Sequence, residues 1–280
     1  MPVQFSPVVP ARHRPLAGFR SLQFVDLDKL GVAASPLAVL DDFRVSEMPF
    51  SAHPHAGFAA VTYIFEDSET GVRSRTSFGA DLVAGPGGIV WTHAGSGVIH
   101  EEVPAQRGRE LHGLQLFVNL TSKNKLSPAQ VLALQPDEVP EWRSGTNGRV
   151  RVVVGSFEGA SSPLVPKEPF SLLDVELGHK VSYATEAGSN TVIYVVDGSL
   201  FVAAGPQLER LSAGQALALS HGAEVVSLES ADRAHFLVFA GRAIHEPVVE
   251  EGPFIMNDRS QIEAARARYH SGEMGGLSPR

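Results

Sequence analysis

The stretch VTYIFEDS at residues 61–68 returns in altered form as VIYVVDGS at residues 192–199. Tyr63 of the first stretch corresponds to Tyr194 of the second, an offset of 131 residues. A second pair of stretches, LVAGPGGIV at 82–90 and LSAGQALAL at 211–219, matches Gly85 with Gly214 at an offset of 129 residues. The nearly constant offset predicts two copies of one fold, although short strands of similar composition can also converge.

Short runs of β-branched and aromatic residues fill both copies. They predict strands at 59–65, 87–92, 111–120 and 149–157, and again at 192–196, 200–204, 215–220, 224–230 and 234–241. Gly, Pro, Asp and Ser separate these runs, as is typical of an all-β sandwich or barrel rather than of alternating strands and helices. The segment 121–148 is polar and rich in turn-forming residues. It predicts a linker, and we expect two domains, 1–130 and 131–280.

One helix is predicted near the C-terminus. Ser260 and Glu263 have the Ser-x-x-Glu spacing of a capping box, the run QIEAARARYH follows, and Gly272 stands where a helix would end. Ile262, Ala265 and Tyr269 would share one face. We expect this helix to pack on a barrel.

Composition excludes several classes of function. The chain has 280 residues, 43% of them hydrophobic, which is enough for a sizeable core, and a formal net charge of −8. Such a charge argues against direct binding of nucleic acid, and the absence of cysteine excludes disulfides, thiolate zinc sites and cysteine nucleophiles. No apolar run has membrane-spanning length and the N-terminus has no signal-peptide pattern. We expect a cytoplasmic protein.

Two short motifs carry candidate metal ligands. In SAHPHAGF (51–58), His53 and His55 flank Pro54, and on a strand their side chains would share a face about 6.6 Å apart. In GVIHEE (97–102), His100 and Glu102 would share a face while the residue between them points away. Either pair alone could arise by chance. If an antiparallel barrel sets the two strands opposite each other across its interior, four ligands can converge on one ion, whereas burying them without an ion would be unfavourable.

These motifs resemble a known family. HPHAGFAAVTYIFEDS, GPGGIVWTHAGSGVIHEE, LHGLQLFVNL and EPVVEEGPFIMN are similar to motifs of the pirins, a branch of the cupin superfamily, and the resemblance extends from LDDFR (40–44) to the final helix. It implies a bicupin of two β-barrels, with one iron in the N-terminal barrel. Transferred by motif, the ligands are His53, His55, His100 and Glu102.

The second copy lacks such a set. Its corresponding positions fall at or near Ala184, Glu186, Glu229 and Ala231, which predicts a C-terminal barrel without metal. Its expected role is to pack against and shield the other barrel.

The sequence also departs from the usual pirin pattern. Ala56, Ala59 and Ala60 stand where Arg and Glu-Thr are common, and Ser96 stands where Arg is common. One hypothesis is that these small residues widen the entrance to the site. Outside the presumed ligands, we expect His112 to be a hydrogen-bonded barrel residue, with a place on the cavity wall as the alternative.

Three imidazoles and one carboxylate suit Fe(II), with Zn, Ni, Cu or Mn able to compete. A six-coordinate ion would keep two positions open, as oxygenases require, whereas a closed tetrahedral zinc site would be structural.

Some pirin-like proteins cleave the flavonol quercetin with dioxygen, so the resemblance implies a possible quercetin 2,3-dioxygenase with a small aromatic substrate. Glu102 is then the candidate catalytic base. The alternative is a metal- or redox-dependent regulator that binds a protein partner, either a transcription factor or a metabolic enzyme. A metal-bearing remnant with neither activity is the third possibility.

Overall fold

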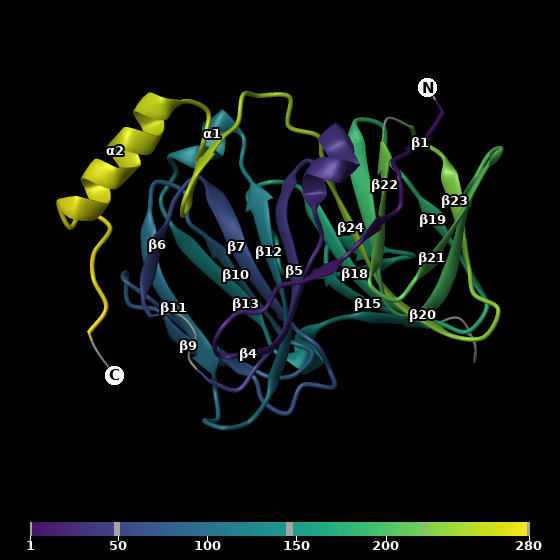
Figure 1. The fold of residues 1–280 in the computed structure, drawn as a ribbon, viewed down its shortest axis with the longest axis horizontal. Helices are drawn as coiled ribbons and strands as arrows, with labels where there is room; N and C mark the ends of the chain where they lie inside the picture. Colours follow the sequence, from purple (N-terminus) through teal and green to yellow (C-terminus); the bar gives the residue numbers. More distant parts are fainter. Residues whose placement is uncertain (1, 48–50, 144–147, 221, 279–280) are drawn as a thin grey trace. The chain divides into compact units, whose positions relative to one another are not determined.

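The computed structural model describes residues 2–47, 51–143, 148–220 and 222–278 (Figure 1). Strands dominate, which confirms the all-β prediction, and the chain divides into two compact units. The first, which we call the cavity unit, contains His13–Leu22, Leu37–Pro136 and Ile244–Arg280. The second, which we call the second unit, contains Met1–Arg12, Gln23–Pro36 and Asp137–Ala243.

These units do not follow the division at residue 130 expected from the sequence. That boundary falls inside strand β13 (Gln130–Leu134), which pairs with β10 (Ile89–His93) in the cavity unit. The end of the chain also belongs to this unit rather than to the second unit. Long-range strand pairing, which chain order does not reveal, decides both assignments.

Two sheets form the cavity unit. The larger has the order β13-β10-β7-β12-β5-β4-β3, and the smaller has the order β6-β11-β8-β9. The further bounds are β3 (Arg12–His13), β4 (Phe19–Phe24), β5 (Leu37–Val45), β6 (His53–His55), β7 (Phe58–Ile64), β8 (Val72–Thr76), β9 (Asp81–Ala84), β11 (Val98–Pro104), β12 (Leu111–Asn119) and α1 (Ser122–Lys125). The C-terminal part adds β25 (Val249–Glu251), β26 (Phe254–Met256) and α2 (Arg259–His270).

The second unit repeats this strand order. Its main sheet path runs β1-β22-β20-β24-β18-β15-β14, so β22-β20-β24-β18 corresponds to β10-β7-β12-β5. The prediction of two copies of one β-fold is therefore confirmed. The bounds are β1 (Gln4–Phe5), β2 (Val9–Pro10), η1 (Leu27–Ala34), η2 (Pro136–Glu138), β14 (Glu141–Arg143), β15 (Gly148–Val154), β16 (Ser156–Phe157), β17 (Ala160–Ser161), β18 (Phe170–Leu177), β19 (Lys180–Ala184), β20 (Ser189–Ala204), β21 (Gln207–Ser212), β22 (Gln215–Ser220), β23 (Val225–Glu229) and β24 (Ala234–Arg242).

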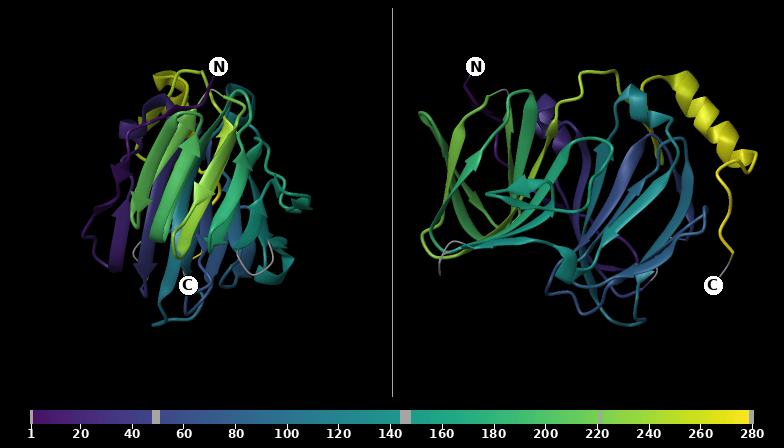
Figure 2. Two further views of the ribbon diagram at one scale, coloured as in Figure 1. Left: turned by 90° about the vertical axis from the view of Figure 1, so that its right-hand side faces the viewer. Right: turned by 180° about the vertical axis from the view of Figure 1, so that it is seen from behind.

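Helix α2 forms where it was predicted but begins differently. Asp258 is its N-cap, and its side chain accepts a hydrogen bond from the backbone N–H of Gln261, so the capping-box prediction for Ser260 was wrong. Ile262 and Ala265 are buried against the cavity unit, whereas Tyr269 is partly exposed. Both views of Figure 2 show this helix, in yellow, at the end of the chain. Among the described residues, no helix has the length and apolar character needed to cross a membrane.

Candidate metal centre

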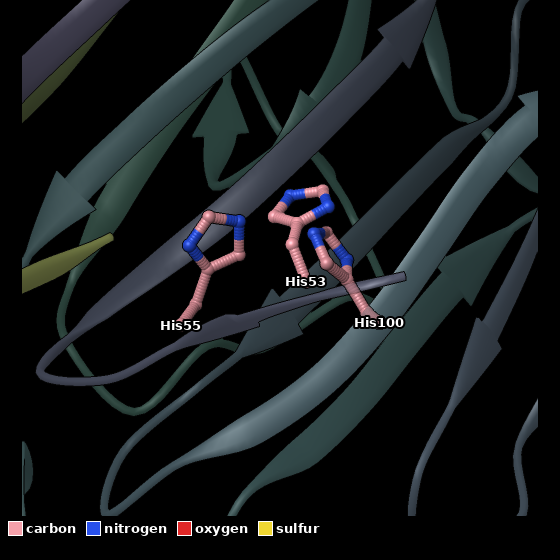
Figure 3. Close-up of side chains that lie close together, drawn as sticks. All are labelled: His53, His55 and His100. Atoms are coloured by element: carbon pink, nitrogen blue, oxygen red, sulfur yellow. The ribbon is translucent and has the colours of Figure 1, made fainter. Parts of the chain in front are cut away.

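Three imidazoles meet on two neighbouring strands of the cavity unit (Figure 3). Strand β6 pairs with β11 so that His53 lies directly opposite His100. The ring centroids of His53, His55 and His100 lie 4.7–4.8 Å from one another, and one ligand nitrogen of each lies within 4.8 Å of the others. The strands are thus hydrogen-bonded neighbours, and the expectation that they face each other across the barrel was wrong.

Backbone carbonyls fix the tautomers of two of these rings. The Nδ1 of His53 donates to the carbonyl of Ser51 at 2.9 Å, and the Nδ1 of His55 donates to the carbonyl of Pro253 at 3.4 Å. Because a carbonyl oxygen only accepts, each Nδ1 carries the proton and each Nε2 keeps its lone pair. A carbonyl or carboxylate that holds the far nitrogen in this way is the usual support of a metal-binding histidine.

Burial keeps the rings of His55 and His100 neutral. It lowers the pKa of His55 to about 3, with the nearby His53 lowering it further, and it lowers the pKa of His100 well below the ordinary value. Within the described residues, the Nδ1 of His100 is buried and has no hydrogen-bond partner. Neutral imidazoles with available lone pairs are the form that binds a divalent cation, so this donor set fits a metal ion.

Glu102 lies on the same face of β11 but outside this group of three histidines. Its Oε2 accepts a hydrogen bond from the hydroxyl of Thr62 on β7. Burial raises the pKa of Glu102, and the hydrogen bond from Thr62 opposes this rise. Glu101 points the other way, as predicted, and pairs with Arg75 at 3.6 Å. The structure therefore places Glu102 in the wall beside the histidines, with its carboxylate directed to Thr62.

The histidines open into a cavity of about 400 Å³ within the cavity unit. Both sheets line it, and its wall is mostly apolar, formed by Leu22, Phe43, Val45, Val72, Leu111 and Phe117. A volume of this size is typical of small-molecule sites. Besides the histidines, the polar residues Glu102, Thr62, Gln115, Asp41 and Arg14 line it, so this cavity is suited to a flat, largely apolar ligand that carries polar groups and meets a metal at one end.

A buried lysine holds the chain that follows the His-Pro-His motif. The ammonium of Lys125 donates to the carbonyls of Gly57 at 2.9 Å and Ile255 at 3.0 Å, and also to the side chain of Asn119. Gly57 has a φ of 84°, and a Cβ there would lie 1.9 Å from the carbonyl oxygen of Ile255. Lys125 and Gly57 therefore hold strand β26 against the residues that follow His55. Pro253, just before β26, fixes the tautomer of His55.

The small residues that depart from the pirin pattern do not line the cavity. Ala56, Ala59 and Ala60 are fully buried, and Ala56 packs with Phe254 and other apolar residues of the C-terminal segment. None of these side chains lines the cavity, so the structure gives no support to the hypothesis that they widen its entrance. The same holds for Ser96, whose carbonyl accepts a hydrogen bond from Arg268 at 3.0 Å.

His112 faces away from the cavity. Its ring is bonded to Asp67 through Nδ1 and to Asp42 through Nε2 at 3.2 Å. This observation confirms the expectation of a hydrogen-bonded barrel residue. Among the described residues, the second unit contains no comparable group of histidines and carboxylates. Its strands β19 and β23, which carry Ala184 and Glu229 from the corresponding positions named above, pair with each other as β6 and β11 do and contain no histidine.

Sequence patterns did not single out Thr62, Lys125 or the Pro253–Ile255 backbone as parts of this site. Thr62 lies in a stretch that was predicted to be a strand from its apolar residues alone, and Lys125 lies in the segment that was predicted to be a linker. A charged residue in a linker gives no sign of burial. The motif EPVVEEGPFIMN did mark the C-terminal segment, but only the fold shows that it contacts Gly57 and His55.

Two protein-family models match most of the chain. The model described as Pirin matches residues 11–118, and the model described as Pirin C-terminal cupin domain matches residues 172–275. A Pseudomonas aeruginosa protein provisionally named quercetin 2,3-dioxygenase is 34% identical over 249 residues, covering 85% of this chain and 86% of that protein. Human pirin is 31% identical over 246 residues, covering 86% and 83%.

Solved structures have the same fold. The crystal structure of quercetin 2,3-dioxygenase from Acinetobacter baumannii matches with a TM-score of 0.88 and 25% identity, covering 99% of this chain and 100% of that one. A bacterial pirin from Escherichia coli, solved in complex with nickel(II), matches with a TM-score of 0.65 and 17% identity, covering 86% and 100%. Metal binding is thus documented for a protein of this fold.

Proposed function

This chain belongs to the pirin family, and from that premise we propose that it is a metal-dependent dioxygenase that opens the heterocycle of a flavonol such as quercetin. The observation that carries the proposal is the group of three imidazoles at the wall of a cavity of about 400 Å³. The relatives named as quercetin 2,3-dioxygenases support the choice of substrate.

The residues proposed to hold the metal are His53, His55, His100 and Glu102. Fe(II) is the proposed ion, because mixed imidazole and carboxylate ligands suit it, with Ni, Zn, Cu and Mn as competitors. When bound, such an ion supplies Lewis acidity toward a ligand oxygen and a place for dioxygen to react. A cytoplasmic location belongs to the same proposal, because ferrous iron persists in a reducing compartment.

Side chains of the cavity unit are proposed to accept a proton, to exclude water and to position the metal ligands. We assign Glu102 to accept the proton of the flavonol hydroxyl, because its carboxylate lies in the cavity wall beside the histidines and a carboxylate can act as a general base. The apolar wall excludes water from the flat rings. Pro253, through His55, and Lys125, through Gly57, keep the donor set in place.

The test is aerobic incubation of the iron-loaded protein with quercetin. Opening the heterocycle interrupts the conjugation that gives the flavonol its visible absorption, so the band should bleach faster than with an equal amount of free iron. The His100→Ala variant is the matched control. It should lose metal content, measured by elemental analysis, together with activity.

Bleaching no faster than that of free iron would refute the enzymatic proposal. Metal bound without turnover would favour the regulator, in which a change of iron charge alters the surface offered to a protein partner. A pulldown from native lysate with reduced and oxidised protein would then be the deciding measurement. The regulator hypothesis requires that the amount of recovered partner changes with the oxidation state of the metal.

A further inference from the structure

Three polar side chains form a line along the cavity wall, and this line leads away from the histidines. Asp41 on β5 lies opposite Gln115 on β12, and Gln115 lies opposite Thr62 on β7. All three line the cavity. Directly opposed residues of antiparallel strands point to the same face of the sheet, so the three side chains form one line. Thr62 begins this line, because it contacts Glu102, and Asp41 ends it.

Two members of the line have partners within the protein. The hydroxyl of Thr62 donates to Glu102 and lies 3.2 Å from the amide oxygen of Gln115. The amide nitrogen of Gln115 donates to the carbonyl of Val61 at 3.0 Å. These two residues fix the wall and leave little hydrogen-bonding capacity for a ligand.

Asp41 differs from both. Within the described residues, no group donates a hydrogen bond to its carboxylate, and only Arg14 acts on it, through its charge. Burial raises the pKa of Asp41 to about 6, with Arg14 opposing the rise. Arg14 lines the same cavity, so the carboxylate has a cation in its surroundings but no hydrogen-bond donor, and burying it in this state is unfavourable. The neighbouring Asp42 faces the other side of the strand and bonds His112, as an aspartate with a structural role does.

We propose that Asp41 is a second recognition point in the cavity, accepting a hydrogen bond from a ligand hydroxyl remote from the histidines. The inference rests on the flavonol function proposed above and narrows its substrate class. Thr62 and Asp41 are two strand spacings apart, about 10 Å. The substrate is therefore a flat polyphenol with a metal-binding oxygen at one end and a hydroxyl on an outer ring.

The test compares two ligands by calorimetry on iron-loaded protein without dioxygen. Quercetin carries hydroxyls on its outer rings, whereas 3-hydroxyflavone carries only the hydroxyl next to its carbonyl. A hydrogen bond to a charged group contributes about tenfold or more in affinity. The wild type should therefore bind quercetin at least about tenfold more tightly than 3-hydroxyflavone.

Replacing Asp41 separates the explanations. In Asp41→Leu and Asp41→Asn, the ratio of the two affinities should fall about tenfold in the leucine variant and by less in the asparagine variant, which keeps an acceptor. Affinity for 3-hydroxyflavone should stay within about threefold of the wild type. The control is Asp81→Asn, on β9 and outside the cavity, which should change neither affinity.

The outcomes are distinct. An unchanged ratio in Asp41→Leu, with both ligands still bound, would overturn the role of Asp41 and leave the flavonol proposal standing. Failure of the wild type to bind either ligand would overturn the flavonol proposal and this inference with it. Loss of affinity for both ligands equally would assign Asp41 to the shape of the cavity and would also overturn its role in recognition.

Discussion

Replacing Asp41 with Asn should make the protein more stable, and only above the pH at which the wild-type carboxyl ionises. Burial raises the pKa of Asp41 in the folded protein from its ordinary value of 3.8 to about 6. Ionisation is therefore easier in the unfolded chain than in the folded one. Asparagine has nearly the same shape and no charge, so it removes this unfavourable ionisation and leaves the packing intact.

The magnitude follows from the difference between the two pKa values. Each pH unit of difference corresponds to about 1.4 kcal/mol, so a rise from 3.8 to about 6 gives a penalty of about 3 kcal/mol. Below about pH 4 the carboxyl is neutral in both states and there is no penalty. Between about pH 4 and 6 the folded state binds the extra proton, so the free energy of unfolding falls as pH rises. Above about pH 6 the penalty is complete.

The assay is urea unfolding of the metal-free protein at several pH values, followed by the fluorescence of Trp91, which is fully buried in the cavity unit. The other tryptophan, Trp142, lies in the second unit, so a Trp142→Phe background isolates the signal. The gain in Asp41→Asn should be near zero at pH 4 and approach about 3 kcal/mol at pH 7.

Asp42→Asn is the matched contrast. It alters the neighbouring residue on the opposite face, where the carboxylate bonds His112, and it should lower stability. The reasoning about Asp41 is refuted if Asp41→Asn is less stable than the wild type at pH 7, or if its gain does not depend on pH.

Three further predictions concern the supports of the site. Lys125→Met should lower the free energy of unfolding by about 3 kcal/mol in the same assay, because buried carbonyls lose their donor; an unchanged midpoint would contradict this. Gly57→Ala should lower it by at least about 2 kcal/mol, since its φ is 84° and a Cβ would overlap the backbone of Ile255; wild-type stability would show that the chain relaxes there. Glu102→Gln should slow quercetin bleaching about a hundredfold, with metal content measured in parallel, and full activity in a metal-loaded variant would exclude Glu102 as the base.

Several features of the site were readable from the sequence, and each depends on local spacing. The His-x-His and His-x-Glu spacings predicted which side chains share a face of a strand, and the structure brings His53, His55 and His100 together. The similarity of the stretches around Tyr63 and Tyr194 predicted two copies of one β-fold, which the repeated strand order confirms. Strand alternation with a period of two suffices for such statements.

By itself, then, the sequence determined the all-β class, the duplication, the family and the candidate ligands, because these follow from composition, period and motif. Only the tertiary structure decided that β6 and β11 are neighbours, that Asp41 rather than Asp42 lines the cavity, and that Lys125 joins Gly57 to Ile255. Gly57 and Ile255 are nearly 200 residues apart in the chain. The register between distant strands depends on burial and hydrogen bonding summed over the whole unit, which no local pattern encodes.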